Sequence, residues 1–111
     1  MQEEKRLPGK IRRRMRSMGI DISPAVNIGK RGIDAAMGEI DRQLKDLGLV
    51  KVKFLKSVVG ERKELAREVA MRLDAELIEV RGRTFLLFRP REGWSKYLRK
   101  LRRGTGGGSN N

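Results

Sequence analysis

The sequence predicts an α/β (α+β, two-layer) protein in which helices pack on a mixed four-stranded sheet. Apolar residues recur at helical spacing in some segments, and short runs of strand-like composition separate them. Their order is α-β-α-β-α-β-β, followed by one more helix. Strand–helix–strand units imply parallel pairing through right-handed crossovers, whereas a final hairpin adds an antiparallel strand. The length of 111 residues suits one domain without an internal linker.

The first predicted helix begins at Pro8, a residue that fits the first turn of a helix, and ends at Gly19. Ile11, Met15 and Met18 form its apolar stripe. Most of its other positions are basic: Arg12, Arg13, Arg14 and Arg16. The stripe is narrow and lacks an aromatic anchor, so the pattern does not favour a helix that lies on a membrane surface.

A short strand at 24–28 and a helix at 33–47 are predicted next. Asp34 is the expected N-cap of this helix, and Gly48 is the expected stop. A second strand follows at 49–55. Its alternation places apolar residues on one face and lysines on the other, namely Val50, Val52 and Phe54 against Lys51 and Lys53.

The second half of the chain predicts a helix at 61–73 and then a hairpin. Strands at 75–80 and 84–88 are joined by the short connection Arg81-Gly82-Arg83. A basic helix at 92–103 comes last. Its apolar stripe consists of Trp94, Leu98 and Leu101, so Trp94 is expected to anchor this helix to the sheet.

Positive charge is concentrated at the two ends of the chain. Lys and Arg number 27 against 14 Asp and Glu, which gives a formal net charge of +13. Residues 1–32 contain nine basic and three acidic residues, residues 33–80 contain nine and ten, and residues 81–111 contain nine and one. Because the terminal excess has no internal counter-charge, the composition favours a polyanion as the partner.

The composition also excludes several classes of function. The chain has no Cys and no His, which excludes disulfides, a Cys/His zinc site, a thiolate nucleophile and imidazole acid–base catalysis. The acidic residues lie mostly on helix faces without the spacing of metal ligands. We therefore expect no enzymatic activity, no cofactor, no metal and no small-molecule substrate. No stretch approaches the ~20 apolar residues of a membrane span, which favours a soluble, cytoplasmic protein. We also expect it to be a monomer.

A loop with the sequence Gly29-Lys30-Arg31-Gly32 lies between a predicted strand and a predicted helix. The glycines allow the backbone to come close to a sugar–phosphate chain, and the helix start offers unpaired N–H groups. Lys30 and Arg31 add two positive charges, and KH domains use a GXXG loop to clamp nucleic acid in this way. Asp34 places a negative charge nearby, which works mildly against anion binding. The loop matches neither a Walker A motif nor a dinucleotide fingerprint.

Three motifs in register resemble the CRM domain, named for chloroplast RNA splicing and ribosome maturation, and its single-domain YhbY-type proteins. They are residues 24–33, residues 49–53, and residues 82–84 together with 88–90. The resemblance implies a fold like the C-terminal domain of translation initiation factor three. It also implies RNA binding through the loop and adjacent basic surface, and association with large-subunit ribosomal precursors.

The resemblance suggests a CRM-like domain at 8–90. From composition and pattern we also expect a flexible segment at 1–7, a basic helix at 91–103 and a disordered Gly-rich tail at 104–111. The expected partner is RNA, either rRNA or a pre-ribosomal particle. The expected RNA-binding residues are Gly29, Lys30, Arg31, Gly32, Arg12, Arg13, Arg16, Lys51, Lys53, Arg81 and Arg83. Alternatives are a stoichiometric ribosomal protein, a general RNA chaperone or splicing cofactor, an enzyme acting on RNA, and a DNA-binding chromatin protein.

Overall fold

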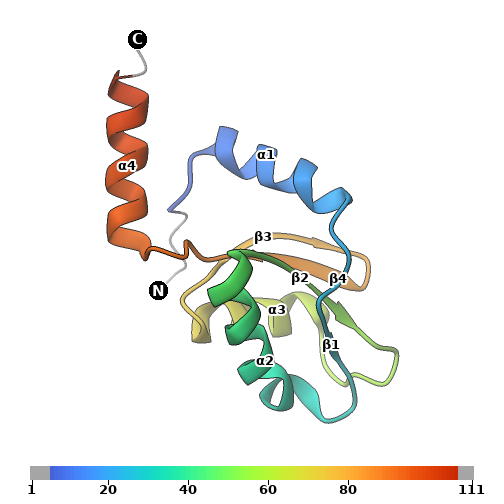
Figure 1. The fold of residues 1–111 in the computed structure, drawn as a ribbon. Helices are drawn as coiled ribbons and strands as arrows, with labels where there is room; N and C mark the ends of the chain where they lie inside the picture. The colour runs from blue at the N-terminus through green and yellow to red at the C-terminus, as the bar shows by residue number, and fades with distance from the viewer. Residues whose placement is uncertain (1–5, 108–111) are drawn as a thin grey trace.

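A computed structural model describes residues 6–107 and confirms the predicted α/β class and order of elements (Figure 1). The helices and strands are α1 (Gly9–Ile20), β1 (Val26–Ile28), α2 (Gly32–Leu47), β2 (Leu49–Phe54), α3 (Arg62–Arg72), β3 (Glu76–Arg81), β4 (Thr84–Phe88) and α4 (Trp94–Gly107).

The four strands form one mixed sheet in the order β1-β2-β4-β3. β1 is parallel to β2, as predicted, while β4 is antiparallel to both β2 and β3. The predicted direct pairing of β2 with β3 across α3 is therefore wrong, because β4 lies between them. The apolar sequence of β4 explains its central position in the sheet, since residues 85–88 are all buried. A strand that is apolar on both faces gains most from a central position with helices above and below.

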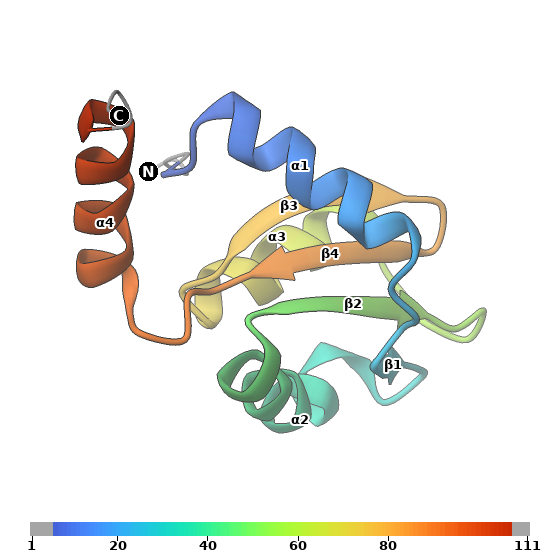
Figure 2. The same cartoon turned by 45° about the horizontal axis from the view of Figure 1, so that its top comes forward.

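Helices lie on both faces of the sheet (Figures 1 and 2). The larger core lies between the sheet and the pair α2 and α3, and it includes Ile40, Leu44, Phe54 and Phe85. A second apolar cluster lies under α1 and the start of α4. It consists of Leu7, Met15, Ile78, Leu86 and Phe88, with partly buried residues around them. This cluster adds a partial third layer to the two layers that were predicted.

Gly19 is a packing residue of α1 rather than its predicted stop. It is buried against Leu86, and a Cβ atom at position 19 would lie 2.6 Å from the Leu86 Cδ2 atom. The helix continues to Ile20, and the absence of a side chain at Gly19 is what allows α1 to approach the sheet so closely. Met18, predicted on the apolar stripe, is instead 52% exposed.

The structure also describes parts of the segments on either side of the predicted domain. Leu7 is buried and Arg6 forms an ion pair with Asp74, so these two residues contact the domain. α4 extends to Gly107, past the predicted end of this helix at residue 103. The rest of both predicted segments, 1–5 and 108–111, lies outside the described residues.

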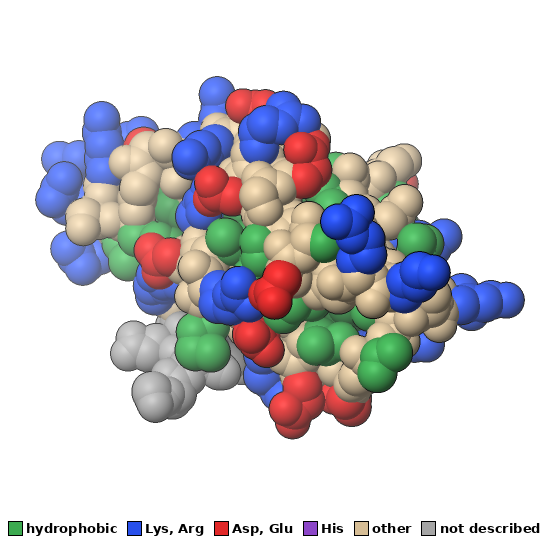
Figure 3. All heavy atoms as spheres, turned by 90° about the horizontal axis from the view of Figure 1, so that it is seen from below, with side chains coloured by type: hydrophobic (Ala, Val, Ile, Leu, Met, Phe, Trp, Pro, Cys, Tyr) green, Lys and Arg blue, Asp and Glu red, His purple; other side chains and the backbone are tan. Residues whose placement is uncertain are grey.

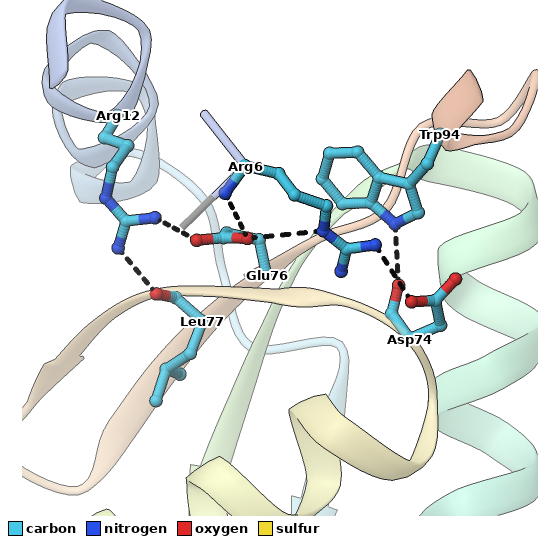
Figure 4. Close-up of polar contacts among 6 residues, drawn as sticks. All are labelled: Arg6, Arg12, Asp74, Glu76, Leu77 and Trp94. Atoms are coloured by element: carbon cyan, nitrogen blue, oxygen red, sulfur yellow. Dashed lines mark hydrogen bonds and ion pairs between the residues drawn. The ribbon is translucent and has the colours of Figure 1, made fainter. Parts of the chain in front are cut away.

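Trp94 anchors α4, as predicted. Its indole Nε1 donates a hydrogen bond to the carbonyl oxygen of Asp74 at 2.8 Å, and its ring packs edge-on against Phe88 (Figure 4). The guanidinium of Arg6 lies 3.9 Å from the centroid of the indole ring. Tyr97 also packs against Phe88, so the first turn of α4 is the part that holds this helix to the sheet.

Candidate functional site

Three of the predicted basic segments meet at one end of the sheet, which we call the loop end (Figure 2). The segments are the turn at residues 29–32, the end of β2, and the β3–β4 hairpin. Ile28, the last residue of β1, pairs with Phe54, the last residue of β2. The backbone N–H of Phe54 donates to the carbonyl oxygen of Arg83 at 2.7 Å. Strand pairing therefore places the Gly29–Gly32 turn and the hairpin on either side of the end of β2.

The Gly29–Gly32 segment is a tight turn that leads directly into α2. The backbone N–H of Gly32 donates to the carbonyl oxygen of Gly29 at 2.9 Å. Gly32 has a φ of +84°, a conformation that favours glycine. Between the glycines, Lys30 and Arg31 are exposed. The turn therefore presents both charges to solvent at the N-terminal end of a helix.

Asp34 does not cap α2, contrary to the prediction. The helix begins at Gly32 with Arg31 as its N-cap residue, and no side chain accepts a hydrogen bond at this cap. Asp34 lies inside the first turn, where its carboxylate accepts a hydrogen bond from Arg72 of α3 at 2.7 Å. The helix start thus lacks a side-chain cap, and Arg72 offsets the negative charge beside the turn.

A cavity of about 110 Å³ lies between α1 and the sheet, next to the loop end. Its lining includes Arg16 of α1, Lys51 of β2 and Arg81 of β3, so the fold brings together three of the predicted residues. Glu79 is the acidic residue in the lining, and it accepts a hydrogen bond from Arg81 at 2.5 Å. With three cations against one carboxylate, the cavity has a net positive charge.

The other predicted cations lie in three different environments. Lys53 is exposed on the α1 side of β2, and Arg83 is exposed in the hairpin. Arg13 is exposed on the outer surface of α1. Arg12 differs because its side chain is only 14% exposed, forms an ion pair with the buried Glu76, and donates to the carbonyl oxygen of Leu77 at 2.8 Å (Figure 4). These contacts hold α1 to β3 and engage Arg12 within the protein.

Two cations at the loop end were missed by the sequence analysis. Lys56 is exposed in the connection after β2, between Leu55 and Ser57, which lie close to Gly29. Arg62 begins α3 and donates to the carbonyl oxygen of Gly82 at 3.2 Å. For Lys56 the signal was its position directly after a predicted strand end, because connections that leave the same end of a sheet lie together. Arg62 lies at the start of the predicted helix that follows the same connection.

The surface over α2 and α3 differs from the two ends of the molecule. In Figure 3 this face mixes acidic and basic side chains, whereas Lys and Arg gather at both ends. Ion pairs within the helices account for the mixing, such as Lys45 with Asp41 and Arg72 with Glu68. Asp41 also accepts a hydrogen bond from Arg89 at 2.9 Å, and this bond holds the pKa of the Asp41 carboxyl below its ordinary value.

Within residues 6–107, no three side chains of the metal-binding types come together as a cation site. Over the same part of the chain, none of the helices has both the length and the apolar character needed to cross a membrane.

Comparison with known proteins gives consistent matches. The sequence model of the family described as CRS1 / YhbY (CRM) domain matches residues 7–89. A protein of Methanocaldococcus jannaschii named "Probable RNA-binding protein" is 42% identical over 101 residues, covering 89% of this chain and 75% of the relative. A Pseudomonas aeruginosa protein with the same description is 24% identical over 96 residues, covering 86% and 92% of the two chains.

One solved structure is also similar. It is the solution structure of a hypothetical protein from Staphylococcus aureus, described as "a putative RNA binding protein". The two structures superpose with a TM-score of 0.66 at 34% sequence identity, over 76% of this chain and 88% of the other.

Proposed function

The chain belongs to the CRS1/YhbY (CRM) domain family, and from this premise we propose that it is an RNA-binding protein that holds the phosphate backbone at the loop end. The observation that carries the proposal is the meeting of the Gly29–Gly32 turn, the end of β2 and the hairpin at one end of the sheet. Each segment contributes exposed cations there. Names of relatives that describe RNA binding support the same proposal.

The turn supplies the first set of contacts. Lys30 and Arg31 pair with successive phosphates, and the uncapped start of α2 offers backbone N–H groups to the same stretch of RNA. Cations of the hairpin and of β2 extend the contact toward the cavity lined by Arg16, Lys51 and Arg81. Arg12 has no part in this proposal because its guanidinium is engaged with Glu76 and Leu77.

Phosphate contacts dominate because aromatic platforms for bases are absent from the loop end. The aromatic residues near it, Phe54 and Phe85, are 0% and 1% exposed, and Trp94 and Tyr97 lie on α4. Proteins that read unpaired bases commonly stack them on exposed aromatic rings. We therefore infer that binding depends mainly on charge and backbone shape.

The proposed role is binding rather than catalysis. Glu79, the carboxylate in the positive cavity, is engaged by Arg81, so the cavity offers no free pair of carboxylates for acid–base or metal-dependent hydrolysis. We further propose that the protein is a cytoplasmic monomer. Its proposed target is rRNA in large-subunit precursors, as the family resemblance implies. Mass spectrometry of purified precursors and mature subunits tests this role, since a permanent ribosomal component would occur in both.

The binding proposal is tested by titrating labelled RNA and DNA of equal length at several salt concentrations. Several neutralised phosphates predict a log-affinity against log-salt slope of magnitude about 3 to 6. RNA should bind more tightly than DNA, and crosslinking followed by sequencing should recover structured RNA. A flat salt response, or equal affinity for both polymers, would contradict the proposal. Turnover of the labelled RNA would contradict a purely binding role.

A further inference from the structure

α4 carries a second set of cations that the loop end does not include. Lys96, Arg99, Lys100 and Arg103 are all exposed. At 3.6 residues per turn they share one side of the helix, opposite the apolar side. We call these four residues the α4 basic face. The one acidic residue close to them in sequence, Glu92, pairs with Lys100 at 3.2 Å, so most of this charge is not neutralised by that carboxylate.

The α4 basic face lies at the opposite end of the sheet from the loop end. β4 begins at Thr84, which pairs with Lys53 at the loop end, and finishes at Phe88, which pairs with Leu49. The chain then turns into α4. In Figure 1, α4 stands at one end of the molecule, and the connections of the loop end lie at the other. The molecule measures 51 Å along its longest axis.

The direction of the α4 basic face follows from how the helix is anchored. Trp94 and Tyr97 pack against Phe88, so the apolar side of α4 faces the body of the protein. Leu98 and Leu101 share the lining of a cavity with Ile11 of α1. The opposite side of α4 must therefore point outward, and Figure 3 shows Lys and Arg side chains at this end.

Over the α2 and α3 face, no continuous stretch of positive charge connects the loop end with the α4 basic face. Acidic side chains are interspersed with basic ones there (Figure 3). On the other side of the sheet, α1 has exposed cations, and Lys10 of α1 lines a cavity together with Leu98, Leu101 and Arg102 of α4. The α4 basic face lies on the side of the helix opposite to Leu98 and Leu101, and so it is turned away from this cavity. The loop end and the α4 basic face are thus separate and point in different directions.

We propose that the α4 basic face is a second phosphate-binding surface, so that one protein molecule holds two RNA segments at once, one at each end. This inference rests on the proposed function, because both surfaces recognise the same phosphate chemistry. A cluster of four cations on one helix side neutralises several phosphates, as basic helices do when they contact a nucleic-acid backbone. The protein would thereby bring distant parts of a folding RNA together.

Three variants, each losing one Lys and one Arg, separate the two surfaces. Lys96→Ala/Arg99→Ala alters the α4 basic face, Lys30→Ala/Arg31→Ala alters the turn, and Lys45→Ala/Arg67→Ala alters the α2 and α3 face as a control. All six side chains are exposed, so the melting temperature of each variant should stay close to that of the parent. Lys45 pairs with Asp41, which keeps Arg89 as a partner in the control.

The measurement uses two short RNA hairpins, one with a donor dye and one with an acceptor, together with sedimentation to count RNAs per protein. The parent and the control should give energy transfer and a complex of one protein with two RNAs. The α4 variant should keep its first RNA and bind the second roughly 10- to 100-fold more weakly, since two charge-assisted contacts are lost.

Two results would overturn this inference. One is bridging by the α4 variant as strong as that of the control, which would follow if α4 binds an acidic protein instead. The other is a parent complex with one RNA at saturation, which would mean that α4 contacts the RNA already bound at the loop end. The proposed function is tested separately, by adding Lys30→Ala/Arg31→Ala to the α4 variant and titrating one hairpin. If the combined variant binds the hairpin as tightly as the α4 variant does, the loop end is not an RNA-binding site. The proposal for the α4 basic face would then be decided by the bridging measurement alone.

Discussion

The guanidinium of Arg72 lies 2.7 Å from the carboxylate of Asp34, and this ion pair joins α3 to the first turn of α2. Asp34 is the acidic residue closest in sequence to the Lys30 and Arg31 pair. The pKa of Arg72 is raised, chiefly by its hydrogen bond to Asp34. Arg72 therefore acts on the turn indirectly, by offsetting an anion beside the helix start that we propose to bind phosphate.

Arg72→Ala should weaken RNA binding roughly two- to five-fold, which is the size of a single charge effect at a helix terminus. Asp34→Asn should bind as tightly as the parent or more tightly, and it should abolish the effect of Arg72→Ala in the double variant. Fluorescence polarisation with one labelled RNA measures all four proteins. An equal loss from Arg72→Ala in both backgrounds would show instead that Arg72 contacts RNA itself.

Replacing both cations of the turn should reduce affinity strongly without unfolding the protein. Lys30→Ala/Arg31→Ala removes two exposed side chains, so we expect little change in melting temperature. The two lost contacts are together worth about 1.4 to 2.8 kcal/mol, which predicts a loss of roughly 10- to 100-fold at moderate salt. The magnitude of the salt slope should fall by about 2.

The control for this pair is Lys45→Ala/Arg67→Ala, which removes the same charge from the α2 and α3 face. It should cost much less affinity, because Lys45 lies beside Asp41 and neither residue lies at the loop end. Equal losses in the two double variants would mean that net charge alone governs binding.

Trp94→Ala should destabilise the protein by about 2 kcal/mol, because it removes one hydrogen bond, the edge-on contacts with Phe88 and Tyr97, and the contact with the Arg6 guanidinium. Urea unfolding followed by circular dichroism measures the change, since the substitution removes the only tryptophan. Leu98→Ala serves for comparison because Leu98 lies farther along α4, beyond the turn that anchors it. A free energy of unfolding unchanged by Trp94→Ala would show that α4 is held by its later turns.

Acid should remove the contribution of Asp41 to stability. The hydrogen bond from Arg89 is the main reason why the pKa of Asp41 lies below its ordinary value of 3.8 in the folded protein. A carboxyl with a depressed folded-state pKa stabilises the protein above the unfolded-state pKa and loses that contribution as pH falls through the folded-state value. Asp41→Asn should therefore be less stable than the parent at pH 7, and the difference should shrink below a pH of about 4. If Asp41→Asn lowers the free energy of unfolding by the same amount at pH 7 and below about pH 4, the result would contradict this role of Asp41.

A methyl group at position 19 should disturb the contact of α1 with the sheet. In Gly19→Ala the new Cβ would lie 2.6 Å from the Leu86 Cδ2 atom, and Leu86 is only 3% exposed. Overpacking of this kind costs about 1 to 3 kcal/mol, against a helix-propensity gain of up to about 1 kcal/mol. Thermal unfolding measures the net loss, and Leu86→Val in the same chain should restore part of it. Stabilisation by Gly19→Ala alone would mean that α1 shifts freely.

Local sequence patterns predicted the elements well because each depends on its own periodicity. The alternation of Val50, Val52 and Phe54 with the lysines, and the helical spacing of Ile33, Ile40 and Leu44, are both reproduced by burial in the structure. The place of β4 in the sheet was not predicted, because strand order depends on which apolar faces meet in three dimensions.

The candidate site was predictable as a set of segments but not as a set of partners. The Gly29–Gly32 turn and the exposed Lys53 lie where the motifs placed them. Nothing in the spacing of Arg12 indicated that it would meet Glu76, which is more than sixty residues away in the chain. For the same reason Asp34, a typical helix cap by sequence, has Arg72 as its partner instead.

The position of β4 also determines when the protein can fold during synthesis. β4 is the last strand to leave the ribosome, yet β2 and β3 are joined to each other only through it. Until Thr84–Phe88 emerges, both strands have an open edge, and most of the sheet cannot close. An N-terminal fragment that ends before Thr84 would thus expose unpaired strand edges that favour aggregation. A chain that includes β4 can form the whole sheet in one cooperative step. Folding of this domain is accordingly tied to the synthesis of β4.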